Sequence, residues 1–153
     1  MQRHSGCPLQ SRGSPGDISN YGAIILIDTI VADNANASCF NEGARHSAGH
    51  NLDGGDTCGF GSTGDLTDTN PQLGPLQDNG GLPTSLGQTP WTHALHGGGP
   101  AIDAGPEVGC PATDQRGIAR PMDGDFDDTA RCDVGAYEFE LIEVYLPLTA
   151  RRF

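Results

Sequence analysis

A run of aspartates in the last third of the chain has the spacing of a cation-binding loop. Carboxylates occupy alternate positions from residue 123 onward, and one more follows at residue 133. Side chains at this spacing can converge on one oxygen-seeking cation, as in the first half of an EF-hand-type loop. We therefore predict a calcium site here; the alternative is a solvated acidic turn held by Arg120 or Arg131. The predicted ligands are Asp123, Asp125, Asp127, Asp128 and Asp133.

This run departs from the complete EF-hand pattern at two places. The pattern requires a glycine after the third aspartate, and Asp128 stands there instead. It also requires a distant bidentate glutamate, and no glutamate follows at the right distance. Asp133 is the residue that we expect to contribute in its place.

The chain has five cysteines, and none of them forms a CxxC pair, so zinc-ribbon and thioredoxin-like sites are excluded by spacing. Their order favours two local disulfides, Cys39 with Cys58 and Cys110 with Cys132, and leaves Cys7 free. Each disulfide would close a loop of about 20 residues, worth roughly 3 kcal/mol. Such pairing implies an oxidising compartment. The alternative is five buried or inert thiols.

Two histidine pairs have spacings that zinc accepts on a helix. They are His46 with His50 and His93 with His96. Gly49 interrupts the first pair, and a run of glycines follows the second, so neither segment is expected to form a stable helix. We interpret all four as surface or packing histidines.

Acid–base catalysis requires a pair of carboxylates or a carboxylate beside a cation. The candidates are Asp103, Asp114, Arg116 and Asp133, all in turn-rich phrases where aspartate more often supports a turn or pairs with arginine. The chain has no GxSxG nucleophile motif and no lysine for a phosphate-binding loop. Catalysis by this chain is therefore not the leading interpretation.

Composition narrows the class of protein. The 153 residues carry a formal net charge of −12, which makes binding to nucleic acid or anionic lipid unfavourable. With Gly 23 and Pro 11, and hydrophobic residues at 35%, long helices are not expected. Neither an export signal in the first twenty residues nor a transmembrane segment is visible, because no apolar run is long enough.

The strongest strand signal is the segment Tyr21–Asn34, which is rich in β-branched residues. Asp28 interrupts it, and we expect two short strands that meet at this polar corner. Ile25 and Ile27 lie on the opposite parity from Ile24, so both faces are apolar, which is typical of parallel sheets. Further strands are expected within residues 100–105 and 132–148.

Beyond residue 22, the chain resembles the C-terminal part of choice-of-anchor (Q-type) bacterial surface proteins. The matching phrases are DTIVADN (28–34), SAGHNL (47–52), CGF (58–60), NPQLGPLQDNGG (70–81), THAL (92–95), PAIDAG (100–105), CPATDQRGIARP (110–121) and CDVGAYE (132–138). An extra stretch, residues 82–91, separates the fourth phrase from the fifth. Eight phrases in order over about three quarters of the chain make a specific signal.

This resemblance implies an all-β right-handed parallel β-helix, seen here as the end of a partial solenoid. It divides the chain into an irregular arm (1–20), terminal coils and cap (21–139), and a C-terminal strand and tail (140–153). It implies an extracellular or cell-surface location, but no single activity. The function that we expect is that of a non-enzymatic structural or adhesive module. Its partners would be upstream coils, or copies of itself bound through Tyr21–Asn34. The alternative is a fragment of a carbohydrate-active β-helix enzyme with catalytic coils upstream, which would make carbohydrate a ligand.

Overall fold

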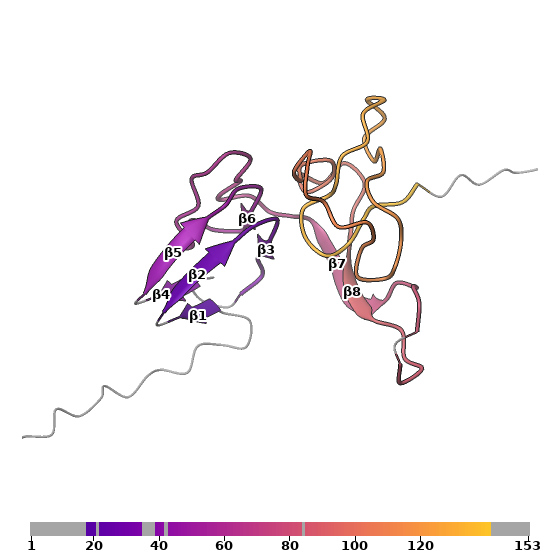
Figure 1. The fold of residues 1–153 in the computed structure, drawn as a ribbon, viewed down its shortest axis with the longest axis horizontal. Coiled ribbons are helices and arrows are strands. Elements are labelled where there is room, and N and C mark those ends of the chain that lie inside the picture. Colours follow the sequence, from indigo (N-terminus) through magenta and orange to yellow (C-terminus); the bar gives the residue numbers. More distant parts are fainter. Residues whose placement is uncertain (1–17, 21, 35–38, 42, 84, 142–153) are drawn as a thin grey trace, which may run out of the picture. The chain divides into compact units, whose positions relative to one another are not determined.

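The computed structural model describes residues 18–20, 22–34, 39–41, 43–83 and 85–141 (Figure 1). Every regular element within these ranges is a β-strand, which confirms the all-β class for the described residues. Among them there is also no helix of the length and apolar character that crossing a membrane requires. The chain forms two compact units, Met1–Pro71 and Gln72–Phe153. The strands are β1 (Ile18–Asn20), β2 (Ala23–Leu26), β3 (Ile30–Val31), β4 (Cys39–Asn41), β5 (Ala44–Ser47), β6 (Leu52–Asp53), β7 (Leu73–Asp78) and β8 (Trp91–Leu95).

The first unit contains three parallel strand pairs, β1–β4, β2–β5 and β3–β6. In each pair, a residue lies beside one that follows it by 21 or 22 positions, as Ala23 lies beside Ala44 and Ile30 beside Leu52. Two successive passes of the chain therefore run side by side in the same direction. A single parallel bridge from Leu52 to Leu66 adds part of a third pass.

The prediction of a right-handed parallel β-helix is wrong. The parallel strands are two to four residues long and form three separate two-stranded sheets, and the second unit has an antiparallel pair instead. Left-handed backbone at Asp28, Asp33 and His50 interrupts the extended chain soon after β2, β3 and β5. Among the described residues, no continuous sheet and no solenoid forms.

Asp28 does form the polar corner that the sequence predicts. It lies between β2 and β3 with a φ of 49°. Aspartate accepts this left-handed conformation more readily than a β-branched residue would. The interruption of the apolar segment at Asp28 is therefore the turn between two strands.

The core of the first unit is small and mixes apolar residues with one disulfide. Leu52 is fully buried, and Val31 packs with Cys39 and Cys58. Asn51 is also fully buried: its side-chain amide nitrogen donates to the Leu26 carbonyl over 3.1 Å. Its side-chain oxygen accepts from the Thr29 N–H over 3.1 Å. A buried amide with its bonds satisfied thus links the two passes of the chain.

In the second unit, β7 and β8 form an antiparallel hairpin with an irregular register between Leu73 and Leu76. The rest of the unit consists of turns that pack over a core around Ala101, Cys132 and Val134. Isolated bridges such as Thr113 to Ala119 join these turns. The strands expected within residues 100–105 and in the described part of 132–148 are absent, because turns occupy both segments.

Candidate functional site

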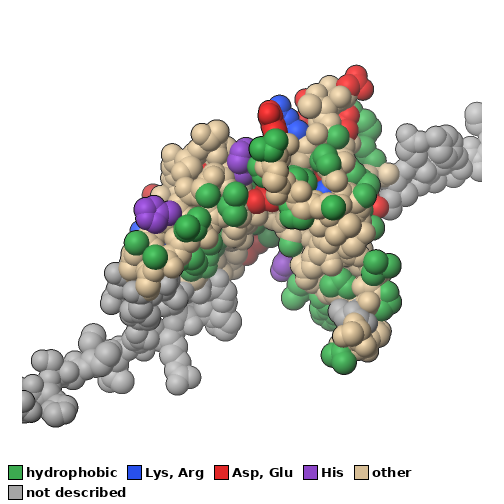
Figure 2. All heavy atoms as spheres, in the orientation of Figure 1, with side chains coloured by type: hydrophobic (Ala, Val, Ile, Leu, Met, Phe, Trp, Pro, Cys, Tyr) green, Lys and Arg blue, Asp and Glu red, His purple; other side chains and the backbone are tan. Residues whose placement is uncertain are grey.

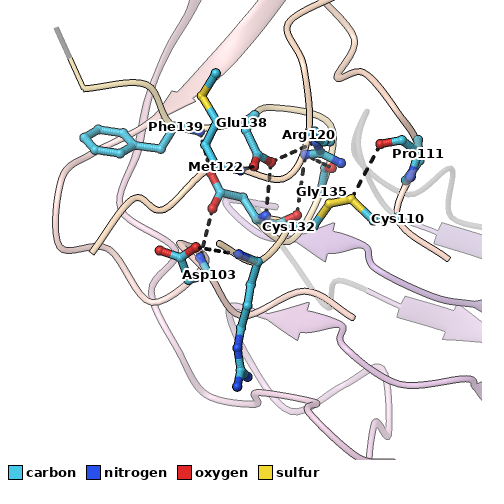
Figure 3. The surroundings of a disulfide bond; sticks show 11 residues. Asp103, Cys110, Pro111, Arg120, Met122, Cys132, Gly135, Glu138 and Phe139 are labelled. Carbon is cyan, nitrogen blue, oxygen red and sulfur yellow. Dashed lines mark hydrogen bonds and ion pairs between the residues drawn. A yellow bond between two sulfur atoms is a disulfide. The ribbon is translucent and has the colours of Figure 1, made fainter. Parts of the chain in front are cut away.

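The second unit contains a group of buried ionic side chains beside the Cys110–Cys132 disulfide (Figure 3). Acidic and basic residues are rarely buried unless they are paired. Here the carboxylates come from the turn at residue 114 and from the segment 133–138, and the guanidinium groups come from residues 116 and 120. The members with almost no exposed side chain are Asp114, Arg116, Arg120, Asp133 and Glu138.

Arg116 is held on several sides at once. Its Nη2 atom lies 2.8 Å from a carboxylate oxygen of Asp114 and donates to the Glu138 carbonyl over 2.6 Å. Its Nη1 atom lies 2.9 Å from Glu140, and its guanidinium group stacks 3.6 Å from the ring centroid of Tyr137. The guanidinium therefore ties the turn at residue 114 to the C-terminal segment of the unit.

Asp114 organises the turn that carries Arg116. Its Oδ1 atom accepts from the backbone N–H groups of Arg116 and Ile118 over 2.7 and 3.0 Å, and its Oδ2 atom accepts from the Glu138 N–H over 3.1 Å. Burial alone would raise the pKa of Asp114. These backbone donors and the Arg116 side chain outweigh it and hold that pKa below its ordinary value.

Glu138 and Arg120 form the second buried pair. Arg120 Nε lies 2.9 Å from Glu138 Oε2, and Arg120 Nη2 donates to the Gly135 carbonyl over 2.9 Å. Glu138 also accepts from the backbone N–H groups of Met122 and Asp133 over 2.7 and 3.1 Å (Figure 3). Burial raises the pKa of Glu138 above its ordinary value despite these donors.

Asp133 is the carboxylate in this group that has no guanidinium partner among the described ion pairs. Its two oxygens accept from the backbone N–H groups of Asp103 (2.9 Å) and Phe139. Burial raises its pKa to about 7, and the charges of Glu138 and Asp103 act in the same direction. Three buried carboxylates therefore share two buried guanidinium groups, and Asp133, which lacks such a partner, keeps its proton up to about pH 7.

The four residues that could perform acid–base catalysis are thus engaged with backbone groups and with each other. Asp114 pairs with Arg116, and Asp103 and Asp133 support turns, as the turn-rich phrases favour. Glu138 is the member of the group that sequence analysis missed. A lone glutamate in CDVGAYE carries no local signal of burial, because the core around it is assembled from distant turns.

The structure brings only part of the predicted calcium loop together. Ligand atoms of Asp123, Asp125 and Asp103 lie within 4.8 Å of one another, whereas Asp127, Asp128 and Asp133 are outside this group. Asp103 was not predicted as a ligand, because it precedes the run by about twenty residues. It reaches the loop because its Oδ2 atom accepts from the Gly124 N–H over 2.9 Å.

Backbone bonds also stabilise this acidic loop without a cation. Asp123 accepts from the N–H groups of Phe126 and Asp128 over 2.7 and 3.0 Å. Burial is the main cause that raises the pKa of Asp103, and the charge of Asp125 adds to it. The geometry fits both a calcium loop and a self-supported acidic turn, so the calcium site stays a prediction.

Calcium binding is expected to raise the thermal stability of the second unit. An affinity of about 10⁻⁴–10⁻³ M, as in extracellular modules, would add roughly 1.4 to 2.7 kcal/mol at about 10 mM calcium. The measurement is a melting curve in calcium and in chelator. Asp125→Asn should abolish the difference, whereas Asp68→Asn, an exposed change in the first unit, should preserve it. Identical wild-type melting curves in the two solutions would show that the acidic loop does not bind calcium.

The histidines do not form a metal site in the described residues, where the only convergent group is the aspartate cluster. His46 lies beside Ile25 in the β2–β5 pair. His93 Nδ1 is 2.7 Å from the Gly74 carbonyl. The interpretation of these two as surface or packing histidines is consistent with both positions.

Both predicted disulfides are present. The Cα atoms of Cys39 and Cys58 are 4.9 Å apart, and those of Cys110 and Cys132 are 6.2 Å apart, both within the range of protein disulfides. Cys7 lies outside the described residues. Because disulfides persist in oxidising compartments, the pairing indicates an oxidising, extracellular-type environment.

Comparison with known proteins gives no identification. No family model matches the chain, and neither a curated protein nor a solved structure matches it. The class defined by the structure is therefore a two-unit, all-β, disulfide-bonded acidic protein. Membership of the choice-of-anchor group stays a prediction from the sequence phrases.

Proposed function

We propose that this chain is a non-enzymatic structural or adhesive module of a secreted or cell-surface protein. The observation that carries the proposal is one disulfide within each compact unit. Both units have few large apolar side chains in their cores, and covalent cross-links compensate for small cores. Such an arrangement suits a protein that must persist outside the cell.

The alternative, a fragment of a carbohydrate-active enzyme, has less support. A catalytic acid–base pair must reach its substrate within hydrogen-bonding distance. Asp114 and Asp133 are buried, and their oxygens accept from backbone N–H groups. Their chemistry is used to hold turns in place, which is a structural role.

The disulfide in the first unit is expected to supply a large part of that unit's stability. Replacing both Cys39 and Cys58 by alanine should lower the free energy of unfolding by about 3 kcal/mol, because the open loop gains entropy in the unfolded state. Urea denaturation followed by circular dichroism measures this change. Cys7→Ala is the matched control and should change nothing. An unaltered unfolding midpoint in the double variant, or in wild type under reductant, would remove the basis of the proposal.

An adhesive or assembling role requires a surface, and β2 offers one. Ile25 and Ile27 are 69% and 54% exposed. The Leu26 carbonyl accepts from Ala48, and the Asp28 N–H donates to Gly49, so alternate residues bond to the neighbouring pass. In a parallel pair the residues between them direct their backbone groups to the other side. Ile25 thus presents an apolar side chain and a strand edge together, and such an edge promotes association.

We expect the chain to self-associate through Tyr21–Asn34, of which the structure describes residues 22–34. Replacing Ile25 and Ile27 by threonine should reduce the associated fraction measured by sedimentation velocity, because it removes exposed apolar surface while keeping β-branched side chains. Added salt should strengthen wild-type association, because it screens the repulsion between chains of charge −12.

The control is Val108→Thr, an equally conservative change at a side chain that is 84% exposed in the second unit. It should leave the associated fraction unchanged. A wild-type chain that stays monomeric at high concentration and high salt would show that the β2 edge is not an assembly surface.

A further inference from the structure

The outward face of the β7–β8 hairpin combines an aromatic ring with a carboxylate. Asp78 pairs with Trp91 across the hairpin, and Leu76 pairs with His93. Paired residues, and residues two apart on a strand, share a face of the sheet, so all four side chains lie on one face. Trp91 is 62% exposed and Leu76 53% exposed. Figure 2 shows hydrophobic side chains over the lower part of this unit, where Figure 1 places β8 and the connection between β7 and β8.

The carboxylate of this face is fixed in place. Asp78 Oδ2 accepts from the Thr89 hydroxyl over 2.6 Å, and Oδ1 accepts from the Gly80 N–H over 2.9 Å. These two bonds hold the pKa of Asp78 below its ordinary value. Asn79 closes the hairpin by donating to the Thr92 carbonyl over 2.7 Å. Each carboxylate oxygen keeps a second lone pair for another donor.

Elsewhere in the same unit, an aromatic ring and a carboxylate together bind a guanidinium group. The Arg116 guanidinium lies over the Tyr137 ring at 3.6 Å and 2.8 Å from the Asp114 carboxylate. A guanidinium group is stabilised there by the negative face of the ring and by the carboxylate together. Tryptophan is a better ring than tyrosine for this contact. None of the ion pairs among the described residues includes Asp78.

We propose that the Asp78–Trp91 face binds an arginine side chain of a partner protein, with the guanidinium group stacked on Trp91 and paired with Asp78. Charge favours this partner, because a chain of net charge −12 attracts cationic segments and repels anionic ones. Leu76 would cover the aliphatic stem of the arginine. This binding site does not depend on the structural role proposed above, since it rests on the hairpin alone.

Trp91 is the only tryptophan in the chain, so its fluorescence reports directly on this face. The probe is a five-residue peptide with one central arginine between glycine and serine, titrated into the full chain. The expected result is a saturable change in Trp91 emission, and none with the same peptide carrying citrulline, which has nearly the same shape and no charge. Asp78→Asn should weaken binding roughly two- to fivefold.

Two further variants separate the site from general charge and from hairpin damage. Glu107→Gln removes one exposed negative charge elsewhere in the same unit and should leave binding unchanged. Thr89→Val removes one bond to Asp78 but keeps its carboxylate, and it should keep the response. Equal weakening by the Asp78 and Glu107 variants would overturn the site, as would a lost response in Thr89→Val. Equal binding of the citrulline peptide, or a saturable response to maltohexaose with none to arginine, would also overturn it.

Discussion

Arg116→Ala is expected to destabilise the second unit by about 3–5 kcal/mol, the usual cost of removing one partner from a buried ion pair. The change leaves Asp114 buried without its cation, and it leaves the Glu138 carbonyl without a donor. It also removes the stacking on Tyr137. Urea denaturation followed by Trp91 fluorescence measures the effect, because Trp91 belongs to this unit.

Arg131→Ala is the matched control for this prediction. Arg131 is 44% exposed and lies 3.5 Å from the exposed Glu107, and surface pairs of this kind contribute about 1 kcal/mol or less. The stability of Arg116→Lys should lie between those of the two alanine variants. Lysine keeps the positive charge but lacks the planar guanidinium group that stacks on a ring and forms several hydrogen bonds at once. Equal unfolding midpoints for Arg116→Ala and Arg131→Ala would mean that the buried network does not stabilise the unit.

The second unit is expected to lose stability as the pH rises from 5 to 8. Asp133 has a pKa of about 7 in the folded chain, against about 3.9 when unfolded. Between these values the folded state holds a proton that the unfolded state has released, so stability falls as pH rises through 7. Between pH 5 and pH 8 the loss is about 2–3 kcal/mol, since about two pH units of this window lie below the folded pKa. The raised pKa values of Glu138 and Asp103 act in the same direction.

On the acid side the sign reverses. The pKa of Asp114 is lowered in the folded state, so its contribution is present above about pH 4 and is lost as the pH falls further. The unfolding midpoint should therefore be highest at mildly acidic pH. Asp133→Asn should flatten the slope between pH 5 and 8, while Glu107→Gln should keep it. A wild-type midpoint that is constant or rises over that range would contradict the prediction.

Local signals in the sequence gave the predictions that the structure confirms. The pairing of Cys39 with Cys58 and of Cys110 with Cys132 follows from neighbours in chain order, and the turn at Asp28 follows from one polar residue inside an apolar segment. The two passes of the first unit are parallel, as apolar residues on both faces of Tyr21–Asn34 indicate. The number of parallel passes was not predictable, because short sequence motifs do not show where the strands stop pairing.

Contacts between distant segments account for what the sequence could not show. Asp103 approaches the acidic loop only because Gly124 donates to its carboxylate, a bond between residues 21 positions apart. Glu138 becomes a buried partner of Arg120 only when several turns close over Cys132. The β7–β8 hairpin was hidden within a segment rich in glycine and proline, whose composition indicates turns rather than strands.

The two disulfides follow each other along the chain without interleaving, and each one closes within a single unit. Each half of the molecule is therefore encoded, together with its own cross-link, by one continuous stretch of sequence. A recombination event between the codons for Pro71 and Gln72 would split no cysteine pair. During evolution, either half could therefore be duplicated, lost or joined to another module without leaving any of these four cysteines unpaired.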